Sequence, residues 1–230
     1  MKPKRRRSVA PGPISKNQTN NQTKNQVRIV GGVLRRTVLA VVPADGLRPT
    51  PDRVRETVFN WLGSRVQNAA CLDLFAGTGA LGLEAASRGA ATVLLNDRDP
   101  SVSGASRLVV DKLRASTDDS ARRCGEAIQV LSQDALALLR SAAVRREQFD
   151  LVFLDPPFGR DWLVRVLPVV GAVLRPGGLL YVESDQAFDP GQAPATTWMV
   201  WRNGQAGQVH YYLLEQTSQP INQPADSPAD

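Results

Sequence analysis

The tetrapeptide Asp155-Pro156-Pro157-Phe158 places an acid, backbone carbonyls and an aromatic ring directly after an apolar run, residues 149–154. Such a run predicts a buried strand of a parallel sheet, and ligands of open α/β sheets bind just beyond the carboxyl ends of strands. The prolines fix φ and lack N–H groups, so the local carbonyls stay available as acceptors. The carboxylate and a carbonyl can accept both N–H groups of an exocyclic amino group, and Phe158 can stack on its ring. The alternative is a strand that simply ends in a Pro-Pro turn.

A glycine-rich loop follows a second short apolar run, residues 70–73, which ends in Asp73. Its glycines, Gly77, Gly79 and Gly82, match the dinucleotide pattern G-x-G-x-x-G. A carboxylate at the tip of the strand would repel a pyrophosphate, whereas it would attract the ammonium of an amino acid. S-adenosylmethionine has such an ammonium and no phosphate. The loop therefore favours a methyl donor, and a dinucleotide is the alternative.

Two more acids follow predicted strands. Asp97 comes 24 residues after Asp73, close to the spacing at which an acid binds ribose hydroxyls in a βαβ unit. Asp134 follows the apolar run 127–131. It can accept a hydrogen bond from the adenine amino group, or it can instead cap the next helix. Both interpretations stay open.

The elements that must position these residues alternate along the chain, which predicts a doubly wound sheet closed by an antiparallel hairpin. Asn203-Gly204 is the expected hairpin turn, and the polar residues 115–125 are an expected loop. The expected strands are 70–73, 92–96, 127–131, 149–154 and 179–183, with hairpin strands 197–201 and 208–214. The expected helices are 80–88, 100–114, 135–144 and 161–174, the last ending in a turn at 175–178.

Residues 27–66 are expected to form an ordered appendage, with a hairpin in 28–39 and a helix from Asp52 to about Leu62. Thr50 is a good N-cap for this helix, and Pro51 suits its first position. Arg48, Arg53 and Arg55 lie at or near the helix start. Any one of them suits a solvated helix face, whereas the three together favour an anionic partner. The predicted apolar face comprises Val54, Val58, Trp61 and Leu62.

The charge is distributed unevenly. The chain has 28 Lys/Arg and 22 Asp/Glu, a net charge of +6. Residues 1–26 have seven basic residues and no acid, and residues 27–66 have seven arginines and three acids, so these parts carry +7 and +4 and the remainder carries −5. The first 26 residues cannot bury a core and are expected to be disordered. They are either a solubilising tail or a sequence-independent attachment to phosphates.

The remaining composition excludes several classes of protein. The sequence is 42% hydrophobic, enough for a sizeable core, yet no apolar run reaches the about 18–20 residues of a membrane span. Cys71 and Cys124 give neither a disulfide framework nor metal-ligand spacing, and the single histidine makes a zinc site improbable. A reducing cytoplasm is the expected location.

Over about residues 27–214 the chain resembles the RsmD type of small-subunit ribosomal RNA guanine-N2 methyltransferase. The R-P-T-x-D-R-V-R-E block is the specific part, whereas the glycine-rich loop and D-P-P-F occur widely among amino-methylating enzymes. The matching motifs are residues 28–32 (R-I-V-G-G), 46–50 (G-L-R-P-T), 52–62 (D-R-V-R-E-T-V-F-N-W-L), 73–82 (D-L-F-A-G-T-G-A-L-G), 155–158 (D-P-P-F), 181–183 (Y-V-E) and 207–209 (G-Q-V).

The resemblance implies an α/β, Rossmann-like class I S-adenosylmethionine-dependent methyltransferase, with a mostly parallel seven-stranded sheet and a C-terminal antiparallel hairpin. The implied division is a disordered basic tail (1–26), an RNA-binding appendage of hairpin plus helix (27–66), a methyltransferase domain (67–215) and a disordered C-terminal tail (216–230). Two departures are the shorter Asp97, where the family usually has Glu, and the loop 115–125, which is longer than usual.

The implied reaction transfers the sulfonium methyl to the exocyclic N2 of a guanine in 16S ribosomal RNA, free or in an assembling small subunit. Asp155 and the Pro156 carbonyl would orient the amino group, and Phe158 would stack on the flipped base. A monomer without metal or membrane attachment is expected. The implied donor-binding residues are Asp73, Phe75, Gly77, Gly79, Asp97, Asp134 and Asp155. The implied RNA-binding residues are Arg28, Arg35, Arg36, Arg48, Arg53 and Arg55.

Three other functions remain open. The same core could methylate adenine N6 of DNA or another RNA, or a glutamine amide in a protein, because D-P-P-F recognises an amino group rather than one base. A nicotinamide-dependent oxidoreductase would need a hydride-site residue that we do not find. A non-catalytic RNA-binding module would keep the fold without the reaction.

Overall fold

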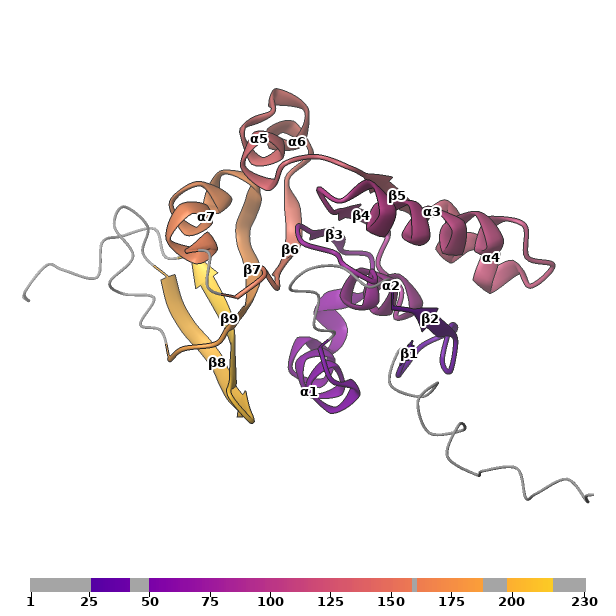
Figure 1. Cartoon of the computed structure of the whole chain (residues 1–230), viewed down its shortest axis with the longest axis horizontal. Helices are drawn as coiled ribbons and strands as arrows, with labels where there is room; N and C mark the ends of the chain where they lie inside the picture. Colours follow the sequence, from indigo (N-terminus) through magenta and orange to yellow (C-terminus); the bar gives the residue numbers. More distant parts are fainter. Residues whose placement is uncertain (1–25, 42–49, 159–160, 188–197, 217–230) are drawn as a thin grey trace, which may run out of the picture.

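The computed structural model describes residues 26–41, 50–158, 161–187 and 198–216 (Figure 1). These residues form a seven-stranded sheet in the order β5-β4-β3-β6-β7-β9-β8 and a small β1-β2 hairpin. Strands β3 to β7 run parallel, and β9 lies antiparallel between β7 and β8. The sheet strands are β3 (Ala70–Asp73), β4 (Thr92–Asn96), β5 (Ile128–Leu131), β6 (Phe149–Leu154), β7 (Leu174–Ser184), β8 (Trp198–Ala206) and β9 (Val209–Gln216).

The strand order reverses between β3 and β6, which lie side by side although β4 and β5 intervene in the sequence. In open α/β sheets such a switch point opens a crevice beyond the carboxyl ends of the two strands. Asp73 ends β3, and Asp155 directly follows β6. The topology therefore places both predicted acids, Asp73 and Asp155, at one crevice. The predicted fold class is confirmed.

Side chains of the central strands point alternately to the two faces of the sheet and pack into two hydrophobic cores, one on each face. In β3, Cys71 belongs to one core and Leu72 to the other. Figure 1 shows α1, α2 and the β1-β2 hairpin below the sheet and α5, α6 and α7 above it. The helices are α1 (Asp52–Leu62), α2 (Ala80–Ser87), α3 (Pro100–Arg114), α4 (Asp119–Glu126), α5 (Ala135–Arg140), α6 (Ala142–Glu147) and α7 (Trp162–Val170), with 3₁₀ turns at Gly63–Val66 and Gly171–Val173.

Helix α1 packs into the core that includes β6 and β7. Its Phe59 ring lies 5.9 Å from the Phe153 ring of β6, centroid to centroid, and Phe153 meets Tyr181 of β7 edge to face at 6.2 Å. Trp61 lies farther out and stacks on Tyr211 at 5.4 Å. The predicted helix bounds are confirmed, and the helix start lies beside the ends of the central strands.

The β1-β2 hairpin, β1 (Gln26–Arg28) and β2 (Val38–Ala40), is anchored on α2. The buried Glu84 accepts hydrogen bonds from the backbone N–H groups of Val30 and Gly31, both at 2.7 Å. Gly32 has a φ of 72°, and a Cβ there would lie 1.9 Å from the Ser87 carbonyl oxygen. The Gly-Gly pair therefore permits a close approach to α2, and the hairpin shares its core with the sheet.

Two segments predicted as irregular lie within a helix or a strand of the structure. Residues 119–126 form helix α4 because Asp118 accepts hydrogen bonds from the N–H groups of Ser120 and Ala121, at 2.8 and 2.9 Å, while Cys124 is buried. Residues 175–178, predicted as a turn, lie inside β7 but form a bulge: Leu174 and Leu179 pair with Phe149 and Leu151 of β6, and Gly177 between them has a φ of 77°.

Two other boundaries differ from the prediction. The helix expected over 135–144 is broken at Ser141, whose extended backbone ends α5 and whose hydroxyl accepts from the N–H of Val144 to cap α6. The C-terminal hairpin turns at Gly207, where φ is 62°, while Asn203 and Gly204 lie within β8. Apart from Gln26, which begins β1, and Gln216, which ends β9, the two predicted tails lie outside the described residues. None of the described helices has the length and apolar character needed to cross a membrane.

Candidate active site

Two acids from neighbouring strands meet at one hydroxyl. Leu154 of β6 pairs with Val182 of β7, so Asp155 and Glu183 occupy corresponding positions at the carboxyl edge of the sheet. The Oγ1 of Thr50 lies 2.8 Å from Glu183 Oε1 and 3.0 Å from Asp155 Oδ2. The Tyr181 hydroxyl donates to the same Glu183 oxygen at 2.8 Å. A continuous hydrogen-bonded chain therefore joins a buried tyrosine to the predicted catalytic acid.

The prediction that Thr50 caps α1 is wrong. Pro51 occupies the N-cap position, and the Thr50 side chain turns away from the helix to the two acids. Sequence reasoning missed this contact because Thr50 lies 105 residues from Asp155 and 133 from Glu183. Tyr181 and Glu183 are two residues apart on β7, so their side chains lie on the same face of the sheet, and this spacing could have placed both on the face that carries Asp155.

Arg55 explains how Thr50 is held. Its side chain is 0% exposed, and Nη1 donates to the Thr50 carbonyl at 2.5 Å. Its Nη2 donates to the Arg28 carbonyl and to Asp52 Oδ1, the latter at 2.9 Å. The prediction that Arg55 contacts RNA is wrong, because a completely buried guanidinium bound to backbone carbonyls cannot reach a phosphate. Arg55 instead joins β1, α1 and the backbone of Thr50.

The electrostatic surroundings favour the protonated forms of the site groups. Burial, and then the nearby Glu183, raise the pKa of Asp155 well above its usual range, while the Thr50 hydrogen bond opposes the rise. Burial also raises the pKa of Glu183, although hydrogen bonds from Tyr181 and Thr50 lower it. The pKa of the Tyr181 phenol is raised well above its usual range by burial and by Glu183. Two acids this close titrate as a pair.

Asp73 is 1% exposed and only half satisfied. Its Oδ2 accepts from the N–H of Gly82 at 3.0 Å, whereas Oδ1 is buried without a hydrogen-bond partner among the described residues. Burial raises the pKa of Asp73 to about 7, against the lowering effect of the Gly82 hydrogen bond. An ammonium beside Oδ1 would supply the missing donor and stabilise the carboxylate. The site thus fits the amino-acid end of S-adenosylmethionine.

The glycine-rich loop brings a second acid beside Asp73. Gly77 and Gly79 have φ of 51° and 75°, so the loop curls back and the N–H of Gly77 donates to Asp97 Oδ2 at 3.0 Å. Asp97 Oδ1 accepts from the N–H of Asp99 at 2.9 Å. A carboxylate has about four acceptor positions, so Asp97 keeps capacity for ribose hydroxyls. The structure therefore brings Asp73, Gly77 and Asp97 together as the sequence predicted.

Asn96, next to Asp97, ties three strand ends together. Its side-chain amide donates to the carbonyls of Leu74 and Gln133 and accepts from the N–H of Gln133, each at 3.1 Å. Sequence reasoning gave Asn96 no such role. The amide fixes the edge of the sheet on which the predicted donor-binding residues are placed.

Asp134 caps α5: its Oδ1 accepts from the N–H groups of Leu136 and Ala137, both at 3.0 Å. The cap interpretation is confirmed, and the contact with adenine stays a prediction for the exposed carboxyl. Phe75 packs edge to face on Trp162 of α7 at 5.1 Å. Phe158 is half-buried at the last described position of its segment, which leaves part of its ring open to a planar ligand.

Among the predicted RNA-binding residues, Arg28, Arg35, Arg36 and Arg53 are exposed on the hairpin and the first turn of α1. Arg28 lies 4.0 Å from Asp52, a loose contact between two half-exposed side chains. Arg48 lies outside the described residues. Within the parts of the chain that are described, no group of three or more His, Cys, Asp or Glu could hold a metal ion.

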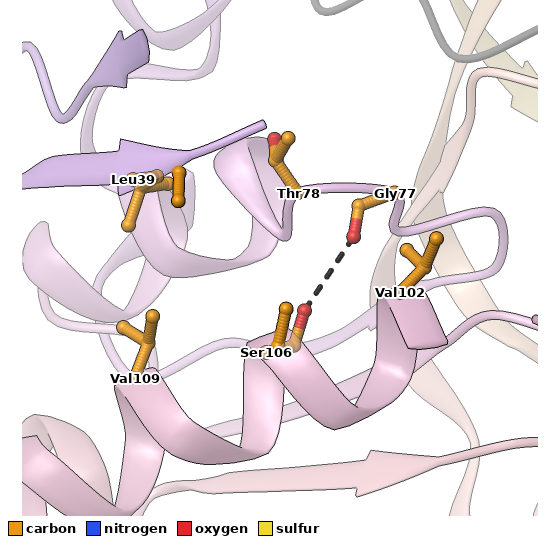
Figure 2. A pocket seen from close by; sticks show the side chains of 8 residues that line it. Leu39, Gly77, Thr78, Val102, Ser106 and Val109 are labelled. Carbon is orange, nitrogen blue, oxygen red and sulfur yellow. Dashed lines mark hydrogen bonds between the residues drawn. The ribbon is translucent and has the colours of Figure 1, made fainter. Parts of the chain in front are cut away.

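Figure 2 shows a pocket between β2 and α3, beside the glycine-rich loop. Its volume is about 30 Å³, and Ser106 Oγ donates to the Gly77 carbonyl across it at 3.4 Å. A space of this size holds about one or two water molecules. The pocket alone is therefore too small for S-adenosylmethionine, although it lies against the glycine-rich loop at Gly77. The lining residues are Leu39, Ala40, Gly77, Thr78, Val102, Ala105, Ser106 and Val109.

Comparison with known proteins gives a consistent result. A family model described as Conserved hypothetical protein 95 matches residues 27–215. The ribosomal RNA small subunit methyltransferase D of Escherichia coli strain K12 is 39% identical over 202 residues, 87% of this chain and 95% of that protein. Its namesake from Haemophilus influenzae is 34% identical over 204 residues, 88% of this chain and 100% of that protein. The solved structure of Escherichia coli yhhF has a TM-score of 0.68 at 38% identity and covers 84% of this chain and 99% of that chain.

Proposed function

The chain belongs to the Conserved hypothetical protein 95 family, the family of the ribosomal RNA small subunit methyltransferases D, and on this premise we propose that it methylates a guanine of 16S ribosomal RNA at the exocyclic N2. The methyl donor is S-adenosylmethionine. The observation that carries the proposal is the pairing of two acids at the switch point. Asp73 has a buried, unsatisfied oxygen, and the half-buried Asp155 uses only Oδ2 in the described hydrogen bonds.

Methylation of guanine N2 requires the amino group to be oriented more than it requires the nitrogen to be activated. The lone pair of a guanine N2 is delocalised into the ring, so it attacks the sulfonium methyl well only when the amino group is held and turned. Asp155 Oδ1 and the Pro156 carbonyl are suited to accept its two N–H groups, a positioning effect worth several kcal/mol. As the N–C bond forms and the S–C bond breaks, positive charge develops on the nitrogen. The Asp155 carboxylate stabilises this charge and can accept the proton that the nitrogen loses.

The donor is held by the other acids of the crevice. Asp73 Oδ1 receives the ammonium, and Asp97 receives the ribose hydroxyls beside Gly77. When bound, the donor supplies an electrophilic methyl group on a cationic sulfur. The half-buried Phe158 stacks on the flipped base, which prevents the amino group from rotating away from the methyl.

The leading part of the chain attracts the RNA. Residues 1–66 carry +11, whereas the remainder carries −5. Phosphate contacts position a protein on nucleic acid without reading its sequence. Arg28, Arg35, Arg36 and Arg53 are exposed and suit this role, and Arg48 is assigned to it from the sequence. Because Arg55 is buried, it supports this surface from within.

A comparison of three possible substrates tests the proposal. The purified protein is incubated with isotope-labelled S-adenosylmethionine and 16S ribosomal RNA, duplex DNA or protein, and each product is digested and identified by mass spectrometry. We expect N2-methylguanosine from the RNA alone. N6-methyladenosine or methylglutamine as the main product would replace guanine N2 by the corresponding alternative. Stabilisation against thermal unfolding by NAD, but not by S-adenosylmethionine, would overturn the methyltransferase assignment itself.

A further inference from the structure

The hydrogen bonds around Thr50 do more than hold the chain together. The Thr50 hydroxyl has one proton but lies within hydrogen-bond distance of two carboxyl groups, Glu183 at 2.8 Å and Asp155 at 3.0 Å. A hydroxyl donates one hydrogen bond and accepts up to two. Both contacts are favourable only when one of the two acids is protonated and donates to Oγ1. The geometry therefore favours one proton shared between Asp155 and Glu183.

Two arrangements of this proton satisfy every contact. In one, Glu183 is protonated and donates to Thr50, which donates to Asp155. In the other, Asp155 is protonated and donates to Thr50, which donates to Glu183. The Tyr181 hydroxyl donates to Glu183 Oε1 in both, because that oxygen keeps a free lone pair. The two arrangements interconvert without moving a heavy atom when one acid passes its proton to Oγ1 while the Thr50 proton passes to the other acid.

Besides Tyr181 of β7, the charged and titratable groups around the pair come from three elements. Asp73 of β3 adds negative charge next to Asp155, and Tyr211 of β9 pairs with Glu183 across the antiparallel ladder. Arg55 of α1 is the nearby cation, and it favours the charged form of Glu183. Its guanidinium is bound to the Thr50 and Arg28 carbonyls and to Asp52, so it faces the pair without neutralising either acid directly.

We propose that Glu183 and Thr50 are positioning residues for Asp155, which hold its carboxyl in place through a shared proton and set the pH at which it accepts the proton of the methylated amino group. The inference rests on the proposed function. At rest the pair holds the shared proton; once that proton is lost, Asp155 is the carboxylate that reacts, and the charge of Glu183 raises the pH at which this carboxylate forms. As the N–C bond forms and the S–C bond breaks, the sulfur keeps the bonding electrons and the nitrogen loses a proton to Asp155. The half-buried Asp155 then returns that proton to water.

The two partners of Asp155 act on its pKa in opposite directions, which gives the proposal a sharp test. Glu183 raises the pKa of Asp155, whereas the Thr50 hydrogen bond lowers it. Glu183→Gln should therefore move the acidic limb of the rate–pH profile to lower pH. Thr50→Val should move the same limb to higher pH and lower the rate at neutral pH by roughly 10- to 100-fold, because the carboxyl loses its anchor. Thr50→Ser should restore most of that loss.

The measurement is the single-turnover rate of methyl transfer at saturating donor and RNA, recorded across a pH series for each variant. Thr92→Val is the matched control, since it removes an exposed hydroxyl from the amino end of β4, the opposite edge of the sheet. Donor affinity and melting temperature are measured beside the rates. If Glu183→Gln does not fold, the comparison of Thr50→Val with Thr50→Ser carries the test.

Limbs displaced in opposite directions by Glu183→Gln and Thr50→Val would support the shared proton. Rates that fall equally at every pH, with the limb unmoved, would overturn it and leave Thr50 and Glu183 as packing residues. The same holds if Thr50→Val and Thr50→Ser behave alike. The identity of the methylated nucleotide tests the proposed function separately, so either can fail without the other.

Discussion

Replacing Asp73 by asparagine should weaken donor binding and yet stabilise the free protein at neutral and higher pH. The folded-state pKa of Asp73 is about 7, against 3.8 for an unperturbed carboxyl, because burial disfavours its charge. The folded state therefore binds more protons than the unfolded state between these values, and stability falls as the pH rises from 4 to 7. Asparagine has a similar shape without the charge, so Asp73→Asn removes this loss.

The size of the effect follows from the span of pH. Each pH unit between the two pKa values costs about 1.4 kcal/mol, and the cost levels off above the folded-state pKa, so the wild-type protein should lose about 3 kcal/mol relative to Asp73→Asn between about pH 5 and pH 8. Because the comparison is made between two pH values, any fixed cost of burying the asparagine amide cancels. For a chain of this length that corresponds to a relative shift in melting temperature of about 6–12 °C.

Thermal unfolding of the donor-free proteins at about pH 5 and pH 8 measures this difference, and calorimetric titration with S-adenosylhomocysteine measures the binding. S-adenosylhomocysteine keeps the ammonium group of the donor and has no methyl group to transfer. We expect wild-type affinity to rise with pH up to about 7 and then level off, and Asp73→Asn to bind weakly at every pH. A melting-temperature difference independent of pH, or an unchanged affinity in Asp73→Asn, would refute the reasoning.

Three further outcomes follow from the structure. Asp97→Ala should weaken donor binding by about tenfold with little dependence on salt, because the lost contacts are hydrogen bonds to a neutral ribose; unchanged affinity in calorimetry would remove Asp97 from the site. Arg55→Met should lower the free energy of unfolding by roughly 2–4 kcal/mol in urea titrations, because buried carbonyls lose their donor. Because Arg53 is exposed, Arg53→Gln should instead leave stability unchanged and flatten the salt dependence of RNA binding in filter assays. If Arg53→Gln lowered stability and Arg55→Met flattened the salt dependence, Arg55 rather than Arg53 would be the RNA contact. Gly32→Ala should detach the hairpin and cost more than about 2 kcal/mol, since its Cβ would meet the Ser87 carbonyl; a wild-type melting curve would contradict this.

Local patterns predicted the parts of the fold whose cause is local. The apolar runs of β4 and β6 and the helix after Pro51 have their expected bounds, because burial on both faces and a proline at a helix start are encoded in neighbouring residues. The switch point then placed Asp73 and Asp155 in one crevice without any knowledge of side-chain contacts. The donor loop was predictable for the same reason, since Gly77 and Gly79 adopt the left-handed conformations that glycine favours.

Features that depend on distant partners were not predictable. Thr50 has every local property of a helix cap, yet two buried acids far along the chain compete successfully for its hydroxyl. Arg55 belongs to a basic cluster in the sequence, but tertiary packing buries it against backbone carbonyls. Residues 119–126 are polar enough for a loop, and they form α4 because Asp118 caps the helix and Cys124 faces the core.

The proposed methylation of guanine N2 in small-subunit ribosomal RNA depends on Asp155. Its most direct test is to map modified nucleotides in 16S ribosomal RNA from cells that lack the protein, complemented with either the wild type or Asp155→Asn. We predict one N2-methylguanosine that is absent without the protein, returns with the wild type and does not return with Asp155→Asn, although the variant still binds the donor. An unchanged set of N2-methylguanosines in all three strains, or full restoration by Asp155→Asn, would contradict the claim.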